Sequence, residues 1–211
     1  MPDQPLHQSL QELSAAFTTT LRARSEEELA RPSRAAAWTV HELLLHQLLD
    51  ARRALVALAS PAGPDDGPPD VDAATYWRAF HPEEGDGGAA HARWVVRAAA
   101  AYDDGASLLE DWEETSGAAA RAAAAADPDA LVTTQGHVLT VRDLVSTLVV
   151  EGTVHLLDAW GEPPAAALDH TLAVLERIHG GPLPPAAGPV EQVLQATGRA
   201  PSDHTAYPLL G

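Results

Sequence analysis

The sequence contains no cysteine. This absence excludes disulfide bonds, thiolate zinc sites and a cysteine nucleophile, so any thiol chemistry would need a thiol from another molecule. Basic residues are also scarce, because 13 Lys and Arg stand against 30 Asp and Glu, for a net charge of −17. Nucleic-acid binding depends on Lys and Arg that neutralise phosphates. We therefore expect no nucleic-acid partner.

Long apolar runs are missing as well. No charge-free apolar stretch reaches the length of about 18 residues that suggests a membrane span, and no signal peptide opens the chain. We therefore expect a soluble, cytoplasmic protein without a membrane partner. The sequence also shows no strand alternation of useful length, no phosphate-binding loop and no Ser-His-Asp elbow. What remains is a hydrophobic fraction of 45%, rich in alanine, which favours helix.

Apolar residues at helical spacing predict an all-α fold, with four long helices around one core and a short helical tail. Thr39 with Glu42, and Thr140 with Asp143, have the spacing of N-terminal capping residues. The Pro/Gly/Asp-rich residues 60–74 predict a loop, and residues 131–138 predict a connection with a turn at Gly136-His137. The long helices are expected at 5–24, 38–59, 89–116 and 139–160, and shorter ones at 75–80, 166–179 and 190–196.

The segment 139–160 is apolar nearly all round, which is typical of a helix buried in the middle of a domain. Glu151, His155 and Asp158 nevertheless share one face, at positions i, i+4 and i+7. An unpaired carboxylate in a core carries a large desolvation penalty. A divalent cation with further ligands from another helix would remove it. A buried Glu–His hydrogen bond, or a polar stripe open to solvent, would also explain the pattern.

The segment 38–59 carries His46 at the edge of its apolar stripe, one turn before Asp50. Taken alone, His46 is either a structural histidine or a ligand, and His41 in the first turn is expected to be exposed. Both long helices begin Thr-Val-x-acid-Leu, and in that register Asp50 falls opposite Glu151. The repeat indicates either a pseudo-symmetric bundle or a chance match.

Two motifs resemble the signatures of a known family. The run Trp38-Thr39-Val40, with Glu42-Leu43 following and His46 eight residues after Trp38, resembles the first signature of the mycothiol-dependent maleylpyruvate isomerase family. The spacing of Glu151, His155 and Asp158 resembles the second. The resemblance extends from Leu6 to Trp160 and implies a DinB/YfiT-like four-helix bundle. We accordingly assign residues 1–162 to a metal-binding bundle and 163–211 to a helical extension packed on it.

The resemblance implies that His46, Glu151 and His155 hold a divalent metal, most commonly zinc, and that Asp158 is a neighbouring ligand or partner. Two imidazoles and one carboxylate leave open coordination positions, which marks a reactive site. In such enzymes the metal binds the thiol of a small cofactor such as mycothiol and lowers the thiol pKa. The thiolate then attacks an electrophilic carbon, and the outcome is a transferred product or an isomer.

The isomerase family carries a larger C-terminal domain that contributes a catalytic arginine, whereas the tail here is short. Arg199 is our candidate for that arginine. Arg78, which follows Tyr76 and Trp77, is the candidate to steady an anionic substrate, unless this segment only packs its aromatics on the bundle. The expected catalytic residues are therefore Arg78, Asp158 and Arg199.

The leading hypothesis is a thiol-dependent S-transferase or isomerase that acts on a small electrophile. A hydrolase with metal-bound hydroxide as nucleophile is the first alternative. A non-catalytic bundle that binds a small molecule is the second. The apolar helices would also permit a homodimer.

Overall fold

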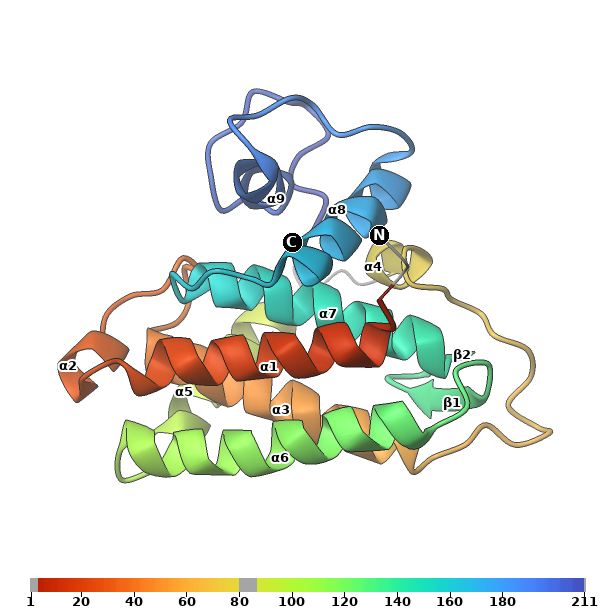
Figure 1. Cartoon of the computed structure of the whole chain (residues 1–211), viewed down its shortest axis with the longest axis horizontal. Coiled ribbons are helices and arrows are strands. Elements are labelled where there is room, and N and C mark those ends of the chain that lie inside the picture. Colours follow the sequence, from red (N-terminus) through yellow and green to blue (C-terminus); the bar gives the residue numbers. More distant parts are fainter. Residues whose placement is uncertain (1–3, 80–86, 211) are drawn as a thin grey trace.

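The computed structural model describes residues 4–79 and 87–210 of the chain. Its four long helices are α1 (Leu6–Arg22), α3 (Val40–Leu58), α6 (Gly105–Ala125) and α7 (Val141–Asp158), which form one bundle (Figure 1). Around the bundle each helix contacts the next in the order α1, α6, α3, α7, and α7 closes the ring against α1. The predicted all-α, DinB-like bundle is confirmed.

Local signals explain where the two central helices begin. The Thr39 hydroxyl accepts a hydrogen bond from the backbone of Glu42, and the Glu42 carboxylate accepts one from the backbone of Thr39, which completes a capping box. Thr140 caps α7 in the same way by accepting from the backbone N–H of Asp143. These contacts satisfy N–H groups that have no partner inside the helix.

Helix α7 is covered on two sides, which explains why its sequence is apolar nearly all round. Val145, Val149 and Leu156 belong to the main core of the bundle. Val154 and Leu157 pack instead into a second apolar cluster with the tail helices α8 (Ala165–His179) and α9 (Pro189–Ala196). Figure 1 shows α8 and α9 stacked on the outer side of α7. The remaining helices of the described residues are α2 (Glu26–Leu29), α4 (Thr75–Ala79) and α5 (Gly87–Ala99).

The connection between α6 and α7 is a β-hairpin, where the sequence predicted a turn at Gly136-His137 but no strands. Strand β1 (Leu131–Thr134) pairs antiparallel with β2 (His137–Thr140). Gln135 and Gly136 both have positive φ, of 51° and 82°, as a tight two-residue hairpin turn requires. Four residues per strand are too few to show a clear alternation. The preceding loop adds support, because Asp70 accepts a hydrogen bond from the backbone of Val138.

The single helix expected over 89–116 is two helices, α5 and α6, separated at residues 100–104. Asp104 caps α6 by accepting from the backbone of Ser107, and the N–H of Gly105 donates to the Glu26 carboxylate. A Cβ atom on Gly105 would collide with Leu29. Gly105 is therefore the first residue of a new helix.

One side chain also differs from expectation, because His41, expected to be exposed, is half-buried on α3. Trp94 on α5 is 45% exposed. The short helix expected at 75–80 is confirmed as α4, although Phe80 lies outside the described residues. Within residues 4–79 and 87–210, no helix has both the length and the apolar composition that crossing a membrane requires.

Candidate metal site and cavity

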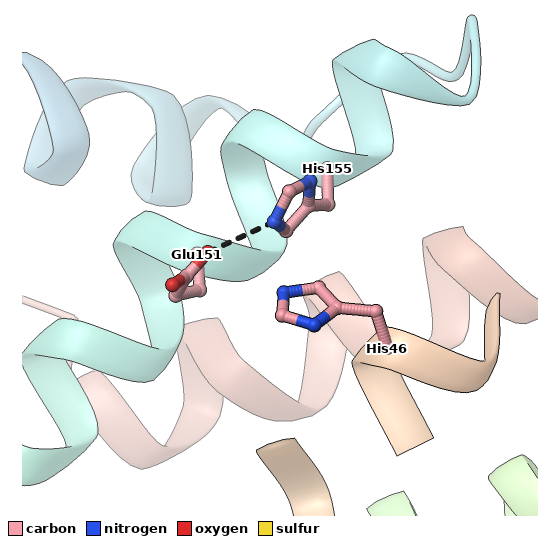
Figure 2. A group of neighbouring side chains, drawn as sticks. All are labelled: His46, Glu151 and His155. Carbon is pink, nitrogen blue, oxygen red and sulfur yellow. Dashed lines mark ion pairs between the residues drawn. The ribbon is translucent and has the colours of Figure 1, made fainter. Parts of the chain in front are cut away.

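Three side chains that could together hold a metal ion converge between α3 and α7. His46 comes from the middle of α3, and Glu151 and His155 lie one turn apart on α7 (Figure 2). One potential ligand atom from each residue lies within 4.8 Å of the other two. Nε2 of His155 is 3.0 Å from Oε2 of Glu151, and the rings of His46 and His155 are nearly perpendicular with centroids 4.8 Å apart. The helices thus bring together the three predicted ligand residues.

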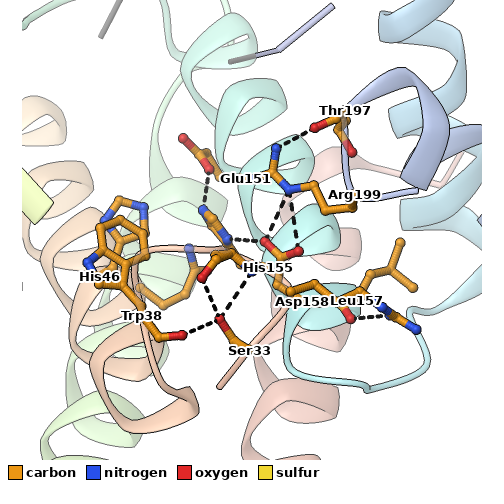
Figure 3. Close-up of polar contacts among 12 residues, drawn as sticks. Ser33, Trp38, His46, Glu151, His155, Leu157, Asp158, Thr197 and Arg199 are labelled. Carbon is orange, nitrogen blue, oxygen red and sulfur yellow. Dashed lines mark hydrogen bonds and ion pairs between the residues drawn. The ribbon is translucent and has the colours of Figure 1, made fainter. Parts of the chain in front are cut away.

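The His155 ring is held from behind by a carboxylate. Its Nδ1 lies 2.9 Å from Oδ2 of Asp158, whose side chain is fully buried (Figure 3). Nε of Arg199 lies 3.4 Å from both oxygens of Asp158, and the Arg199 guanidinium also donates to the carbonyl of Thr197 at 2.6 Å. A carboxylate on the far nitrogen of a histidine is the usual way in which proteins orient a metal-binding imidazole.

The loop before α3 is tied to the end of α7, which fixes the entry of α3 beside the site. The backbone N–H of Arg34 donates to the carbonyl of Asp158 at 3.0 Å, and its guanidinium donates to the carbonyl of Leu157 at 2.5 Å. In the same loop, the Ser33 hydroxyl donates to the carbonyl of Trp38 at 2.8 Å. The indole of Trp38 then stacks on the His46 ring with centroids 4.7 Å apart.

The imidazoles on the two helices differ in protonation state. Burial, and next the charge of the neighbouring His155, lower the pKa of His46 to about 3, so this imidazole is neutral. Burial would lower the pKa of His155 too, but its hydrogen bonds to Asp158 and Glu151 outweigh that effect and raise it to about 9. Burial alone would raise the pKa of Glu151, yet the same contact with His155 lowers it. Without a metal, a protonated His155 therefore links two carboxylates.

The site lies in the wall of a cavity of about 560 Å³. Four aromatic side chains from three separate segments line it, and two arginines, Arg53 and Arg199, add positive charge. Apolar residues of α7 complete the wall. The aromatic members are Trp38, Tyr76, Trp77 and His91.

The three predicted catalytic residues lie in different places in the structure. Arg199 reaches the cavity, and Asp158 sits behind His155 as a partner. Arg78 is not among the residues that line the cavity. It is exposed, and its guanidinium donates to the carbonyls of Arg177 and Ile178 at the end of α8, at 2.9 and 3.1 Å. The interpretation of Arg78 as a substrate-steadying residue therefore lacks structural support, because an arginine close to a helix C-terminus finds free carbonyls there.

The sequence analysis assigned no site role to three ionisable residues that line the cavity. Asp50 and Arg53 follow His46 at i+4 and i+7 on the face of α3 that lines the cavity, so helical spacing could have found them. Asp50 lines the same cavity as Glu151. Burial, and next the negative charge of Glu151, raise the pKa of Asp50 to about 7. His91 on α5 belongs to no motif or periodic pattern that would have linked it to the cavity.

A family model described as the mycothiol maleylpyruvate isomerase N-terminal domain matches residues 10–160. The chain belongs to this family. The match spans α1 to the end of α7 and includes His46, Glu151 and His155. The resemblance inferred from the two signatures is thereby confirmed. No curated protein matches the sequence significantly.

A solved structure also resembles the chain. It is the crystal structure of a histidine-to-alanine mutant of the mycothiol-dependent maleylpyruvate isomerase, with 17% sequence identity and a TM-score of 0.62. The match covers 94% of this chain and 91% of that one, and it shows a shared fold. Because so much of that chain is matched, the expectation that this protein has a much shorter C-terminal region than the isomerase was wrong.

Proposed function

We propose that this protein is a metal-dependent enzyme that uses a small thiol cofactor to isomerise a small electrophile or to transfer the thiol to it. Membership of the mycothiol maleylpyruvate isomerase N-terminal domain family makes mycothiol the first thiol to test. The single observation that carries the proposal is the convergence of His46, Glu151 and His155 in the wall of a large cavity.

The donor set fits a divalent cation, and zinc first. Two imidazole nitrogens and one carboxylate are a common protein ligand set of reactive zinc sites, which keep a further position open. Asp158 occupies Nδ1 of His155 and leaves Nε2 for the ion. His46 is neutral and so keeps a lone pair for coordination. When bound, the ion would lower the pKa of a thiol coordinated to it and hold a nucleophile ready at neutral pH.

The cavity is also suited to a small-molecule ligand. Its volume of about 560 Å³ is within the usual range for small-molecule sites, about 300–1,000 Å³. Arg199 lies beside the metal group, where its guanidinium can pair with an anionic group on the substrate. Trp38 covers the His46 ring and shelters that side from water. An accessible cavity favours an enzyme over a relic site closed by bulky apolar side chains.

The proposal is tested by metal analysis joined to three assays. The purified protein should contain about one divalent ion per chain, and the His155→Ala variant should contain none. With mycothiol and the ion restored, we expect turnover either of maleylpyruvate or of a general electrophile such as monochlorobimane. A third reaction, ester hydrolysis without any thiol, measures the hydrolase alternative.

Each result separates the candidates. Turnover that requires both the ion and the thiol supports the proposal. Hydrolysis at the same rate with and without thiol would replace it with the hydrolase. Absence of any bound divalent ion, with no effect of His155→Ala, would rule out metal-dependent chemistry altogether.

A further inference from the structure

The two arginines of the cavity wall differ in how closely protein carboxylates approach them. Arg199 lies 3.4 Å from both carboxylate oxygens of Asp158 and also donates to the carbonyl of Thr197. For Arg53, the nearest carboxylate among the described residues is that of Asp50, 4.0 Å away. The sequence has 30 acidic residues against 13 Lys and Arg, so a closer acid would have been easy to supply. Arg53 therefore keeps charge and donors for a ligand.

A glutamine at the tip of the hairpin holds the Arg53 guanidinium. A guanidinium has only donors, so the amide oxygen of Gln135 accepts from Nε and Nη1 of Arg53. The amide nitrogen of Gln135 then faces the Tyr76 hydroxyl, 2.9 Å away. All three side chains line the large cavity, and they come from α3, the hairpin turn and α4. The contact with Gln135 leaves the Nη2 end of Arg53 for a ligand.

The backbone of Gln135 is unusual for its residue type. Its φ of 51° lies in the left-handed region, which residues other than glycine, asparagine and aspartate rarely adopt. Residues held in such conformations cluster at functional sites, where the surrounding structure compensates for the strain. Here the strained turn presents to the cavity the one side chain that orients Arg53.

The charge of Arg53 acts inside the cavity. Burial, and next the positive charge of Arg53, lower the pKa of His91, which lines the cavity from α5. Arg199 lies instead beside Asp158, behind the His155 ring. The two arginines thus reach the cavity from different elements, Arg53 from α3 and Arg199 from the segment after α9. A ligand next to the metal group can therefore meet a second cation on the α3 side.

We infer that Arg53, held by Gln135, binds a carboxylate of the substrate and makes the enzyme selective for anionic electrophiles. The planar guanidinium fits the two oxygens of a carboxylate, and such charged hydrogen bonds are stronger than neutral ones. Arg53 follows His46 by two helical turns on one face of α3, so a substrate bound there reaches towards the metal group. The inference deepens the proposed function and rests on it for the identity of the ligand as substrate.

Binding of a small carboxylate to the metal-free, full-length protein tests the site without ion, thiol or turnover. Succinate is titrated into wild type and Arg53→Gln, and tryptophan fluorescence reports binding, since Trp38 and Trp77 line the cavity. We expect Arg53→Gln to lower the affinity roughly 10- to 100-fold, as for the loss of a hydrogen bond between charged groups. Arg52→Gln is the matched control, because Arg52 is the next residue on α3 but pairs with Asp111. It should leave succinate binding unchanged.

Kinetics then show which reactant carries the carboxylate. With ion and thiol present, Arg53→Gln should raise the KM of an anionic electrophile, maleylpyruvate, by about 10-fold or more. The KM of neutral monochlorobimane and that of the thiol should not change. A rise confined to the KM of the thiol would overturn the assignment of the carboxylate to the substrate.

Failure of this inference and failure of the proposed function give different results. If succinate binds through Arg53 but no turnover requires ion and thiol, the proposed function fails and the anion site stands. If succinate binds wild type and a folded Arg53→Gln equally, or binds neither, the inference is overturned whatever the turnover. Should Arg53→Gln not fold by circular dichroism, Arg53→Lys replaces it, since lysine keeps the charge but not the fork. We expect a several-fold loss of affinity, and an affinity equal to wild type overturns the inference.

Discussion

The two helices that build the site hold their ligands in different ways. On α7, both ring nitrogens of His155 are engaged, by Glu151 on one side and Asp158 on the other. On α3, the His46 ring is stacked by Trp38, and its buried Nδ1 has no hydrogen-bond partner among the described residues. The α7 half of the site is therefore fixed by charge and hydrogen bonds, whereas the α3 half is held by the stacking of Trp38 and by one longer contact, 3.4 Å, between Nε2 of His46 and Oδ2 of Asp50.

The α7 half should be the more fragile one. In His155→Ala, the carboxylates of Glu151 and Asp158 lose the imidazole between them. We expect ion binding to fall by more than about 1,000-fold and the free energy of unfolding of the metal-free protein to fall by about 3–5 kcal/mol, as when one partner of a buried pair is removed. Zinc content and urea unfolding measure the two effects. A loss below 1 kcal/mol would mean that His155 is not paired in solution.

A substitution in the α3 half should affect ion binding much more than the stability of the protein. His46→Ala removes a ligand but breaks no hydrogen bond, so ion binding should be lost while the metal-free protein loses only about 1–2 kcal/mol, within the ordinary range for point mutants. The same urea series on metal-free protein provides the comparison. Equal destabilisation by His46→Ala and His155→Ala would erase the contrast between the helices.

The tail contacts the site through Arg199, and a substitution there should weaken only the α7 half. Arg199→Ala leaves every ligand in place but removes the cation next to Asp158. We expect a loss of about 10-fold in ion affinity, the lower end for an outer partner of a ligand. Competition with a chelator of known affinity measures it. Arg177→Ala is the control, because Arg177 also lies on the tail but forms an exposed ion pair with Asp72. It should leave the ion affinity unchanged.

The smallest effect should come from Arg78. Its exposed contacts with two carbonyls at the end of α8 lie away from the cavity walls, so Arg78→Ala should leave ion affinity and turnover unchanged and cost at most about 0.5 kcal/mol, as is usual for surface positions. Steady-state kinetics on the substrate found active provides the check. A clear rise in KM would restore the interpretation of Arg78 as a substrate-binding residue.

Much of the site could be predicted because it depends on local geometry. Glu151 and His155 share a face through the pitch of one helix, and Thr39 and Thr140 begin their helices through contacts three residues away. The partnership of His46 with that pair came from the family signatures, because no local rule says which helix lies opposite. Arg78 shows the limit of such reasoning, since a cationic side chain near aromatics fits many surroundings.

The sequence by itself determined helices α3 and α7, their caps and the placement of an acid and an imidazole on one face of α7, since hydrogen bonds between near neighbours and apolar periodicity settle these features. Only the tertiary structure decided that α7 is covered by both bundle and tail, that Trp38 stacks on His46, and that Asp50 and Arg199 reach the same cavity. These features depend on packing between separate segments of the chain, where many arrangements of the same amphipathic faces compete. Side-chain volume and buried charge select among them.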